Sequence, residues 1–468
     1  MVIERFYLAC LSHASYIISS NGEAAVIDPQ RDVQTYRDYL EQHGLRLRYV
    51  IETHLHADFV SGHLELAGAT GAEIVMGRHA GAAFPHRAVE DGDLLRVGTI
   101  SLRVLETPGH TPEGITIAAS DEATPDEPAS LFTGDTLFAG DVGRPDLLGA
   151  VGITKEELAG RLYDSLHGKI LTFPDETRVY PAHGAGSSCG KALRSVEFST
   201  IGTERMTNYA LKPMSREEFI VAITDGQPDA PAYFLADAAI NRQGAPELAL
   251  VITHARAFAA DELADAVHHG AILLDTRDAD AFSRGYIPGS INIGLDGQFA
   301  TWVGTLLPIG TPLVIVAEPG REEESVLRCA RVGYDSVSGY LAGGIATWVK
   351  EGRPVESFRR LDVAELQDEL KSGQPPLVLD VRRDGERAIK SIPGTEYITL
   401  SRLPERAGEL KDVSRPMVVH CAGGYRSAIA ISILRKNGIA DVSDLLGGIG
   451  AWEKAGGAME VEPETVTA

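Results

Sequence analysis

The sequence predicts an α/β protein of three domains, and an internal repeat is the main observation behind that prediction. The segments Ile272–Arg277 and Val378–Arg382 are both apolar strands that end in Asp-x-Arg. The segments 341–348 and 445–452 share the pattern Leu-x-Gly-Gly-Ile-x-x-Trp, again about 100 residues apart. Residues 1–255 lack this repeat. A chain of 468 residues is long enough for two to four domains, so we expect one domain in the first half and two copies of another after it.

Each copy of the repeat alternates short apolar strands with helical stretches, such as Asp261–His268 and Val363–Leu370. Strands that alternate with helices are typical of βαβ units with a parallel sheet. We therefore expect two α/β domains, at residues 256–356 and 357–468.

The pattern of the first 255 residues predicts a different domain, of mixed α/β type. Asn21-Gly22 between two alternating strands predicts a tight hairpin. The acidic segment Asp121–Pro128 predicts a solvated loop. Further strands are expected at Leu47–Glu52, Glu73–Met76, Ser101–Glu106, Ile115–Ala119 and Val179–Tyr180.

Composition excludes several classes of protein. Hydrophobic residues make up 44% and charged residues 23% of the chain, which is ordinary for globular domains. No apolar run is long enough to span a bilayer, and Met1–Phe6 does not resemble a secretory signal, so we expect a cytoplasmic protein without a membrane partner. A net charge of −23 with no Lys/Arg cluster argues against nucleic acid. The four cysteines are scattered, so free thiols are expected.

Histidines and carboxylates follow several predicted strands of the first domain. In Thr53-His-Leu-His-Ala-Asp, the alternation of an extended segment puts His54, His56 and Asp58 on one side. His110, Asp135 and His183 each stand at a later strand end. Imidazoles gathered with carboxylates suit a transition metal.

This ordered set of motifs resembles the metallo-β-lactamase superfamily over nearly the whole N-terminal half. The resemblance implies an αββα sandwich. Dinuclear zinc members usually read His-x-His-x-Asp-His, whereas Phe59 occupies the last place here. A phenyl ring cannot ligate, so we expect a mononuclear site. Two histidines and one carboxylate on one face are typical of non-haem Fe(II) oxygenases.

The segments Gly134–Asp146 and Pro181–Gly190 resemble the iron-dependent persulfide dioxygenases. That resemblance implies one Fe(II) per chain. The sequence leaves open whether Cys189 acts on substrate or packs its Gly-rich loop. The residues that match the family's motifs are His54, His110 and Asp135 as iron ligands, His56, Asp58 and His183 as residues that orient ligands or hold water, and Arg144 and Cys189 near the substrate channel.

A second chemical motif lies in the last domain, where the strand Met417–His420 runs into Cys421-Ala-Gly-Gly-Tyr-Arg-Ser. A cysteine there lies under backbone N–H groups at a helix N-terminus, a field that stabilises a thiolate. Arg426 adds a cationic donor. The module resembles rhodanese, in which the cysteine carries a persulfide. Its Cys-x4-Arg loop is shorter than the Cys-x5-Arg loop of related phosphatases, which favours sulfur transfer.

The first copy of the module has Ala317 where the second has Cys421. Its loop continues into the acidic run Glu322–Glu324, and Cys329 beyond it is expected to pack in a helix. We expect this copy to be catalytically silent.

The combination of domains resembles the multidomain persulfide dioxygenase–sulfurtransferases of bacterial sulfide detoxification. This resemblance implies that a thiol persulfide and O2 give sulfite at iron, while Cys421 makes or uses thiosulfate. Two alternatives remain open: a glyoxalase II-type zinc thioester hydrolase, and a sulfur carrier with an inactive N-terminal domain. The expected partners are small molecules and a second copy of the chain in a homo-oligomer; the carrier thiol stays unidentified.

Overall fold

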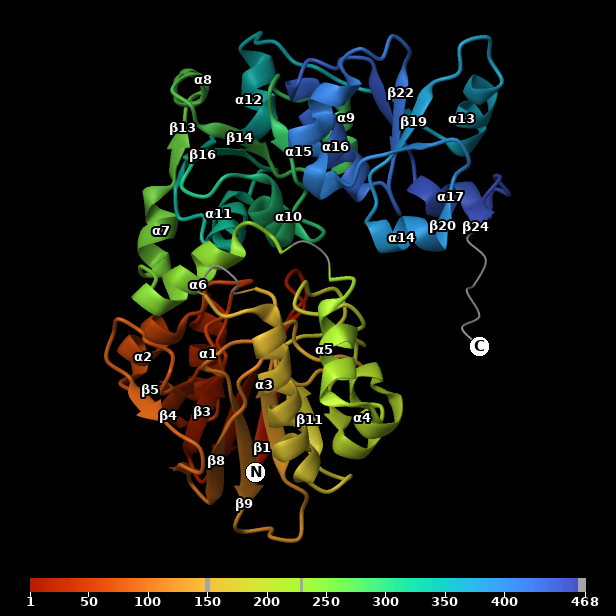
Figure 1. Cartoon of the computed structure of the whole chain (residues 1–468). Coiled ribbons are helices and arrows are strands. Elements are labelled where there is room, and N and C mark those ends of the chain that lie inside the picture. The colour runs from red at the N-terminus through yellow and green to blue at the C-terminus, as the bar shows by residue number, and fades with distance from the viewer. Residues whose placement is uncertain (148–151, 228–229, 462–468) are drawn as a thin grey trace. The chain divides into compact units, whose positions relative to one another are not determined.

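The computed structural model describes residues 1–147, 152–227 and 230–461 (Figure 1). They form two compact units. The first contains Met1–Leu250 together with Cys329–Tyr334, and the second contains Val251–Arg328 and the chain from Asp335 onward. Within the described residues, no helix combines the length and the apolar character needed to cross a bilayer.

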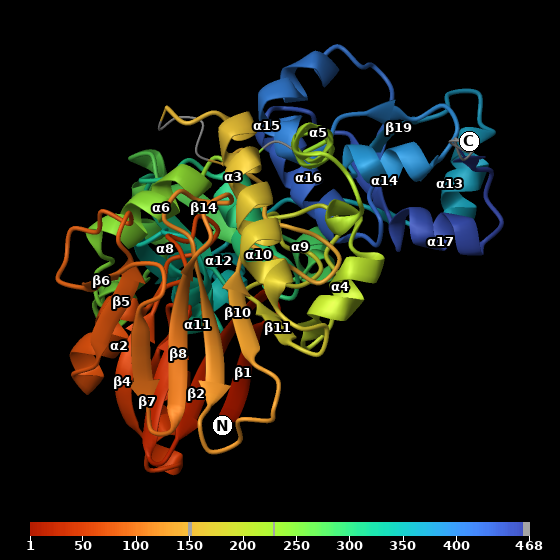
Figure 2. The ribbon, with the colours of Figure 1, turned by 60° about the horizontal axis from the view of Figure 1, so that its bottom comes forward.

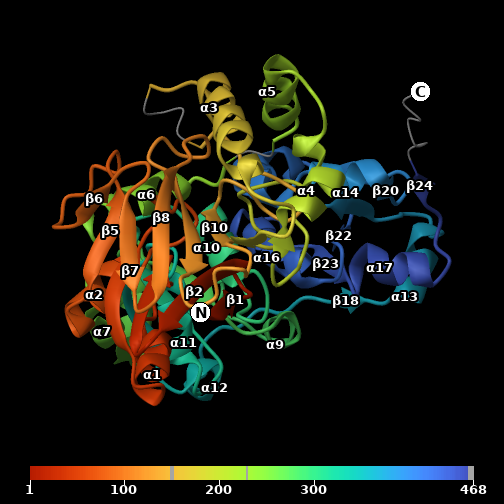
Figure 3. The ribbon, with the colours of Figure 1, turned by 90° about the horizontal axis from the view of Figure 1, so that it is seen from below.

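The first unit is built on two sheets, each with six strands among the described residues; Figures 2 and 3 show them from two sides. One sheet has the order β1-β2-β3-β4-β5-β6 and the other β12-β11-β10-β9-β8-β7. The predicted strands are confirmed. Their bounds are β1 Val2–Leu8, β2 His13–Ser20, β3 Glu23–Ile27, β4 Arg46–Ile51, β5 Glu73–Gly77, β6 Arg87–Val89, β7 Leu94–Val97, β8 Ile100–Glu106, β9 Ile115–Asp121, β10 Ser130–Gly134, β11 Arg178–Pro181 and β12 Ser199–Thr200.

The predicted hairpin joins β2 to β3, which pair antiparallel. Asn21 and Gly22 at its tip have φ of 50° and 77°. Positive φ at both central residues is what a two-residue turn requires for matching the twist of the strands. The Asn-Gly pair therefore fixes the register of the first strands.

Helices cover the outer faces of both sheets. One apolar cluster joins α1 and α2 to the first sheet, and another joins α3, α4 and α5 to the second. The layers are thus α/β/β/α, the sandwich that was predicted. The helices of this unit are α1 Gln34–Gln42, α2 His63–Thr70, α3 Lys155–Gly168, α4 Ile201–Thr207, α5 Arg216–Thr224 and α6 Phe234–Gln243, with short 3-10 helices at Ile170–Thr172 and Tyr209–Leu211; α7 Leu248–His254 begins in this unit.

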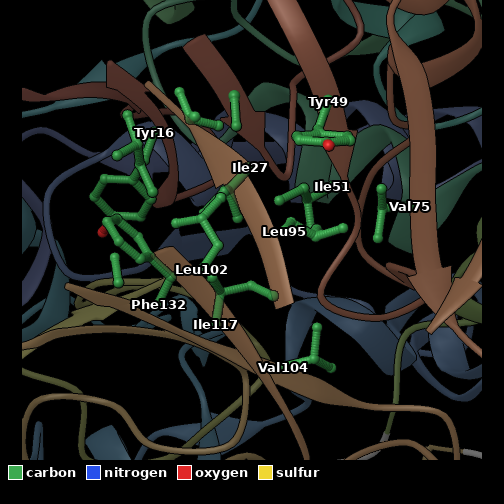
Figure 4. Packing of buried hydrophobic residues seen from close by; sticks show 14 of the residues in the cluster. Tyr16, Ile27, Tyr49, Ile51, Val75, Leu95, Leu102, Val104, Ile117 and Phe132 are labelled. Carbon is green, nitrogen blue, oxygen red and sulfur yellow. The ribbon is translucent and has the colours of Figure 1, made fainter. Parts of the chain in front are cut away.

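The main core lies between the two sheets (Figure 4). Ile27 and Ile51 of the first sheet pack in the same cluster as Leu102 and Ile117 of the second. Within β4, Val50 points the other way, into the cluster under the helices. Because both faces of this strand are buried, its sequence is continuously apolar near its end. Each such side chain stabilises the fold by about 1.5–3 kcal/mol on burial.

This architecture gathers the candidate residues. The segments with His54, His110, Asp135 and His183 each follow the last residue of a strand, namely β4, β8, β10 and β11. Short connections hold these segments at one end of the sandwich, so residues far apart in sequence converge.

The second unit contains two parallel five-stranded sheets among the described residues, with orders β13-β17-β16-β14-β15 and β18-β23-β22-β19-β21. The predicted parallel sheets are confirmed. The strands are β13 Arg256–Phe258, β14 Ile272–Asp275, β15 Ile291–Asn292, β16 Leu313–Val316, β17 Val337–Leu341, β18 Arg360–Leu361, β19 Leu377–Asp380, β20 Lys390–Ser391, β21 Glu396–Tyr397, β22 Met417–His420, β23 Val442–Leu445 and β24 Glu460–Val461.

Helices connect these strands, as the alternating pattern predicts. They are α8 Ala260–His268, α9 Ala279–Arg284, α10 Phe299–Leu306, α11 Glu322–Ala330, α12 Gly344–Lys350, α13 Val363–Leu370, α14 Asp384–Ile389, α15 Leu403–Arg406, α16 Tyr425–Lys436 and α17 Gly448–Lys454, with 3-10 helices at Leu400–Arg402 and Ala407–Leu410.

The Asp-x-Arg element makes the same buried ion pair in both copies. Nε of Arg277 donates to Oδ1 of Asp275 at 2.9 Å, and Nε of Arg382 donates to Oδ1 of Asp380 at 3.0 Å. All four side chains are buried. Removing one partner of such a pair would leave an uncompensated charge, at a cost of about 3–5 kcal/mol.

Candidate metal centre and sulfur-transfer loop

His54, His110 and Asp135 form a buried cluster whose ligand atoms lie within 4.8 Å of one another. Oδ2 of Asp135 lies 3.8 Å from Nε2 of His54 and 3.4 Å from Nε2 of His110. The other ring nitrogens are engaged: Nδ1 of His110 is 2.8 Å from the carbonyl oxygen of Arg144, and Nδ1 of His54 is 2.9 Å from Oγ1 of Thr53. The Nε2 atoms are thereby aimed at the carboxylate. Two imidazoles and one carboxylate can hold a transition metal here.

The charge states favour ligation. Burial lowers the pKa of His54 well below its usual value, so this imidazole stays neutral. Burial alone would raise the pKa of Asp135, but His183, His54 and His110 outweigh it and hold that pKa well below the usual range. Neutral histidine and ionised aspartate are the forms that bind metal.

His56 packs against His54, with ring centroids 4.1 Å apart, but its Nε2 engages a different group of residues. Its Nε2 is 3.2 Å from Oδ1 of Asp28 and 3.2 Å from Oε2 of Glu52. Glu52 also lies 3.3 Å from Nδ1 of His63 and accepts a hydrogen bond from Ser61 at 2.5 Å. Burial opposes ionisation of His56, but the two carboxylates raise its pKa to about 10. The structure therefore turns His56 toward a buried acidic pair.

Asp58, His183 and Cys189 form a second buried cluster with ligand atoms within 4.8 Å of one another. Nδ1 of His183 is 2.9 Å from Oδ1 of Asp135, which connects the two clusters. Burial lowers the pKa of His183, but the carboxylates of Asp135 and Asp58 outweigh burial and raise it well above the usual value. Burial and the neighbouring carboxylates raise the pKa of Cys189 well above that of an ordinary thiol.

Two aromatic neighbours of these clusters were missed from the sequence. His13 is fully buried, and its ring centroid lies 4.1 Å from that of Phe59 and 5.5 Å from that of His183. Tyr233 is also buried, and its pKa is raised by burial and then by Asp58. Neither residue stands in a recognisable motif, and only the fold brings them here.

Arg144 is buried, and its guanidinium is bound both within its own loop and to the loop after β11. Its Nε and Nη2 atoms donate to the two carboxylate oxygens of Asp146, each at 2.7 Å. Its Nη1 donates to the carbonyl oxygen of Ser188 at 3.2 Å, next to Cys189. Arg144 thus ties together the two loops that resemble persulfide dioxygenases.

The thiol of Cys421 sits at the start of α16 as expected. The backbone N–H of Gly424 donates to Sγ at 3.1 Å, and Gly424 has φ of 103°, which favours glycine. The Ser427 hydroxyl lies 3.8 Å from the sulfur. Arg426 makes a bidentate pair with Glu386, with Nη···Oε distances of 2.6 and 2.7 Å.

The first copy of the module differs at this place. Ala317 follows β16, and α11 begins with the acidic run Glu322–Glu324. Within that run, Glu324 pairs with Arg328 at 2.6 Å. Cys329 is buried in the same helix, and burial raises its pKa. The predicted packing role of Cys329 agrees with this burial.

Comparison with known proteins finds matching families for both halves of the chain. Residues 8–183 match the description "Metallo-beta-lactamase superfamily". The bovine (Bos taurus) mitochondrial persulfide dioxygenase ETHE1 is 34% identical over 204 residues, which is 42% of this chain and 70% of that protein. The chain belongs to the metallo-β-lactamase superfamily. Residues 259–351 and 362–455 match the description "Rhodanese-like domain", so this superfamily member also carries two rhodanese domains.

Other relatives of this superfamily member have hydrolase names. A probable metallo-hydrolase of Burkholderia pseudomallei is 32% identical over 52% of this chain and 92% of its own length. A hydroxyacylglutathione hydrolase of Polaromonas is 33% identical over 39% of this chain and 66% of its own length. Among solved structures, a metallo-β-lactamase from Staphylococcus aureus aligns with a TM-score of 0.65 and 32% identity, covering 73% of this chain and 98% of that one.

Proposed function

We propose that this protein oxidises a low-molecular-weight thiol persulfide with O2 to sulfite at one Fe(II), and transfers sulfane sulfur through Cys421. The observation that carries the first activity is the cluster of His54, His110 and Asp135, a donor set suited to a single iron, in a chain whose motif has Phe59 in place of a histidine. The persulfide dioxygenase relatives support this reading. We assign the oxidation to residues 1–255, the silent copy to 256–356 and sulfur transfer to 357–468.

The oxidation converts one persulfide, one O2 and one water to one thiol, one sulfite and two protons. Bound iron would supply the redox chemistry that joins O2 to sulfur. One contact would orient each ligand. Thr53 contacts His54, the carbonyl oxygen of Arg144 contacts His110, and His183 contacts Asp135. Burial of the cluster excludes bulk water from the reacting atoms. Cys189 and Arg144 would lie along the path of the substrate.

Sulfur transfer would use the thiolate of Cys421. The thiolate attacks the sulfane sulfur of thiosulfate, the S–S bond breaks, and sulfite leaves with the electron pair. The cysteine persulfide then passes its outer sulfur to a thiolate acceptor, or to sulfite in the reverse direction. The N–H of Gly424 and the helix N-terminus stabilise negative sulfur throughout.

Thioester hydrolysis is the second candidate function, and the hydroxyacylglutathione hydrolase relatives favour it. In that reaction a metal-bound water attacks a carbonyl carbon, and two metals are usually required. Phe59 argues against a second histidine-rich site. A sulfur carrier with an inactive first domain is less well supported, because the cluster of two imidazoles and a carboxylate is intact.

Oxygen consumption with a panel of synthetic persulfides, those of glutathione and coenzyme A included, tests the proposal. We expect stoichiometric O2 uptake and sulfite with at least one persulfide, and no hydrolysis of the matching thioesters. Thioester hydrolysis without O2 uptake would overturn it. The cytoplasmic location and the homo-oligomeric state stay predictions.

A further inference from the structure

Tyr425 connects the loop around Cys421 to the silent copy of the module. It directly follows Gly424, whose backbone N–H donates to Sγ of Cys421 at 3.1 Å. The hydroxyl of Tyr425 donates to the carbonyl oxygen of Gly294 at 2.7 Å. Gly294 follows β15 of the silent copy, so the reactive loop of one copy is bonded to the backbone of the other.

The ring of Tyr425 also lies against Gly297 of the same segment. A Cβ atom added at Gly297 would lie 2.6 Å from Cε2 and from Cζ of the ring, so the ring would have to move. The φ of Gly297 is outside the left-handed region. The space that the Tyr425 ring takes, and not the backbone conformation, therefore accounts for glycine at this position.

Two arginines of the silent copy hold the segment 294–297. Nη1 of Arg328 in α11 donates to the carbonyl oxygen of Leu295 at 2.6 Å. Nη1 and Nη2 of Arg321 donate to the two carboxylate oxygens of Asp296 at 3.0 and 2.9 Å. The segment that receives Tyr425 is thus bonded to its own domain on one side and to the reactive loop on the other.

Arg321 belongs to the part of the silent copy that corresponds to the Cys421 loop. Ala317 corresponds to Cys421 at an offset of 104 residues, and Arg321 corresponds to Tyr425 at the same offset. The silent loop lacks the nucleophile, but its Arg321 bonds to the segment on which Tyr425 rests. The two corresponding loops are therefore linked through one short segment.

We propose that Tyr425 is a positioning residue, through which the silent copy holds the loop around Cys421 in the arrangement that stabilises anionic sulfur. Tyr425 is the first residue of α16, so a shift of its backbone moves the adjoining N–H of Gly424 away from the sulfur. This role rests on the proposed sulfur transfer by Cys421. It gives the silent copy a part in chemistry for which it has no nucleophile of its own.

Tyr425→Phe in the full chain tests the proposal, because it removes only the hydroxyl that bonds to Gly294. The thiolate absorbance of Cys421 is recorded against pH, as the difference between each chain and its Cys421→Ser counterpart. We expect the thiolate to form at higher pH in Tyr425→Phe, and sulfur transfer at neutral pH to fall about tenfold. The matched control Tyr286→Phe removes a hydroxyl bond of 2.8 Å to Glu356 within the silent copy and should change neither.

The charged groups near Cys421 stay in place in these variants, so a change in thiolate formation reports the backbone of the loop. They are the Arg426–Glu386 pair, Asp444, which accepts a hydrogen bond from Ser427, and His420 with Asp380 beside it.

Gly297→Ala tests the silent copy itself, because the added methyl group would displace the Tyr425 ring. It should move thiolate formation in the same direction as Tyr425→Phe. In a Tyr425→Ala background it should have no further effect, since the ring is gone. Gly285→Ala is the matched control, because its Cβ would meet no described atom within 4 Å and its φ of 175° is extended backbone.

An unchanged thiolate profile in Tyr425→Phe, or an equal shift in the two controls, would overturn the proposal. Circular dichroism establishes that each variant is folded, and Gly297→Ala decides in the same way if Tyr425→Phe fails to fold. The absorbance is measured without a sulfur donor. A chain in which Tyr425→Phe moves thiolate formation but in which Cys421 transfers no sulfur therefore refutes the proposed sulfur transfer alone.

Discussion

Asp135 links two sets of contacts through its two carboxylate oxygens. Oδ2 faces Nε2 of His110 at 3.4 Å, and Oδ1 lies 2.9 Å from Nδ1 of His183. A carboxylate fixed in this way binds a metal in one orientation, because rotation would break the bond to His183. A single side chain therefore sets the geometry of the candidate iron centre.

Replacement of His54, His110 or Asp135 by alanine should each abolish iron binding and O2 uptake. The wild type should hold about one iron per chain, since two imidazoles and one carboxylate suit a mononuclear site. Elemental analysis and an oxygen electrode measure both effects. His43→Ala, at an exposed histidine, is the matched control and should keep both. Two zinc ions per chain with retained activity would contradict the iron assignment.

Glu386 should stabilise the last domain in a pH-dependent way. Burial opposes its ionisation, but its bonds to Arg426 hold its pKa below the usual value. The ion pair therefore contributes stability above the unfolded pKa of Glu386, and the contribution is lost as the pH falls through the lower folded pKa. Glu386→Gln should destabilise by about 1 kcal/mol at pH 7 and by much less near pH 3. Calorimetry of the full chain at both pH values measures this, and an equal difference at both would contradict it.

The ends of strands decide which residues meet. β4, β8, β10 and β11 each deliver at least one candidate residue to the same end of the sandwich, and β22 delivers Cys421 to the start of α16. In the Cys421 loop, Gly424 adopts φ of 103° so that its N–H can reach the sulfur. Each site therefore depends on where the strands end, and less on any single residue.

Cys421→Ser should remove thiosulfate:thiol sulfur transfer and leave oxidation of an added persulfide largely intact, because the two activities use different domains. A cyanide or thiol acceptor assay and an oxygen electrode report the two activities. Cys10→Ser, at a half-buried cysteine of the first unit, should change neither. Sulfur transfer that survives Cys421→Ser would refute the nucleophile.

Ala317→Cys should not create sulfur transfer in the silent copy. The helix that follows begins with Glu322 and Glu323, so negative charge replaces the environment that favours an anionic sulfur at Cys421. The acceptor assay in a Cys421→Ser background measures this. Activity there would show that the acidic run is not what silences the copy.

Sequence patterns were sufficient for the strands and the parallel sheets, because periodicity is a local signal. The set His54, His110 and Asp135 came from the family resemblance, whereas alternation alone grouped His54 with His56 and Asp58, which the structure places in three different clusters. Sequence patterns were insufficient for the direction of His56, which depends on Asp28 and Glu52 in separate elements. His13 lay outside any motif and joined the site only through the pairing of its strand end with His183.

Two active domains on one chain raise the question of how sulfite passes from the first domain to Cys421. Sulfite is small and diffusible, so the wild type should convert persulfide to thiosulfate, and Cys421→Ser should accumulate sulfite. Two sites on one chain gain from effective concentration only if the intermediate passes directly between them.

A mixture of Cys421→Ser and His110→Ala chains measures this coupling. We expect the mixture to form thiosulfate as fast as the wild type at equal concentrations of each site, because sulfite travels through solvent. Thiosulfate is assayed over time at several protein concentrations. A much slower mixture would contradict diffusion and indicate direct transfer.

The buried pair Asp275–Arg277 separates what the repeated module needs for folding from what it needs for chemistry. The first copy has this pair, which matches Asp380–Arg382 of the second copy, although it has Ala317 in place of Cys421. Replacement of the nucleophile leaves the fold intact, whereas loss of either charged partner would cost about 3–5 kcal/mol of stability. The pair shared by both copies therefore marks what the module needs in order to fold, whereas Cys421, present in one copy, marks what sulfur transfer would need.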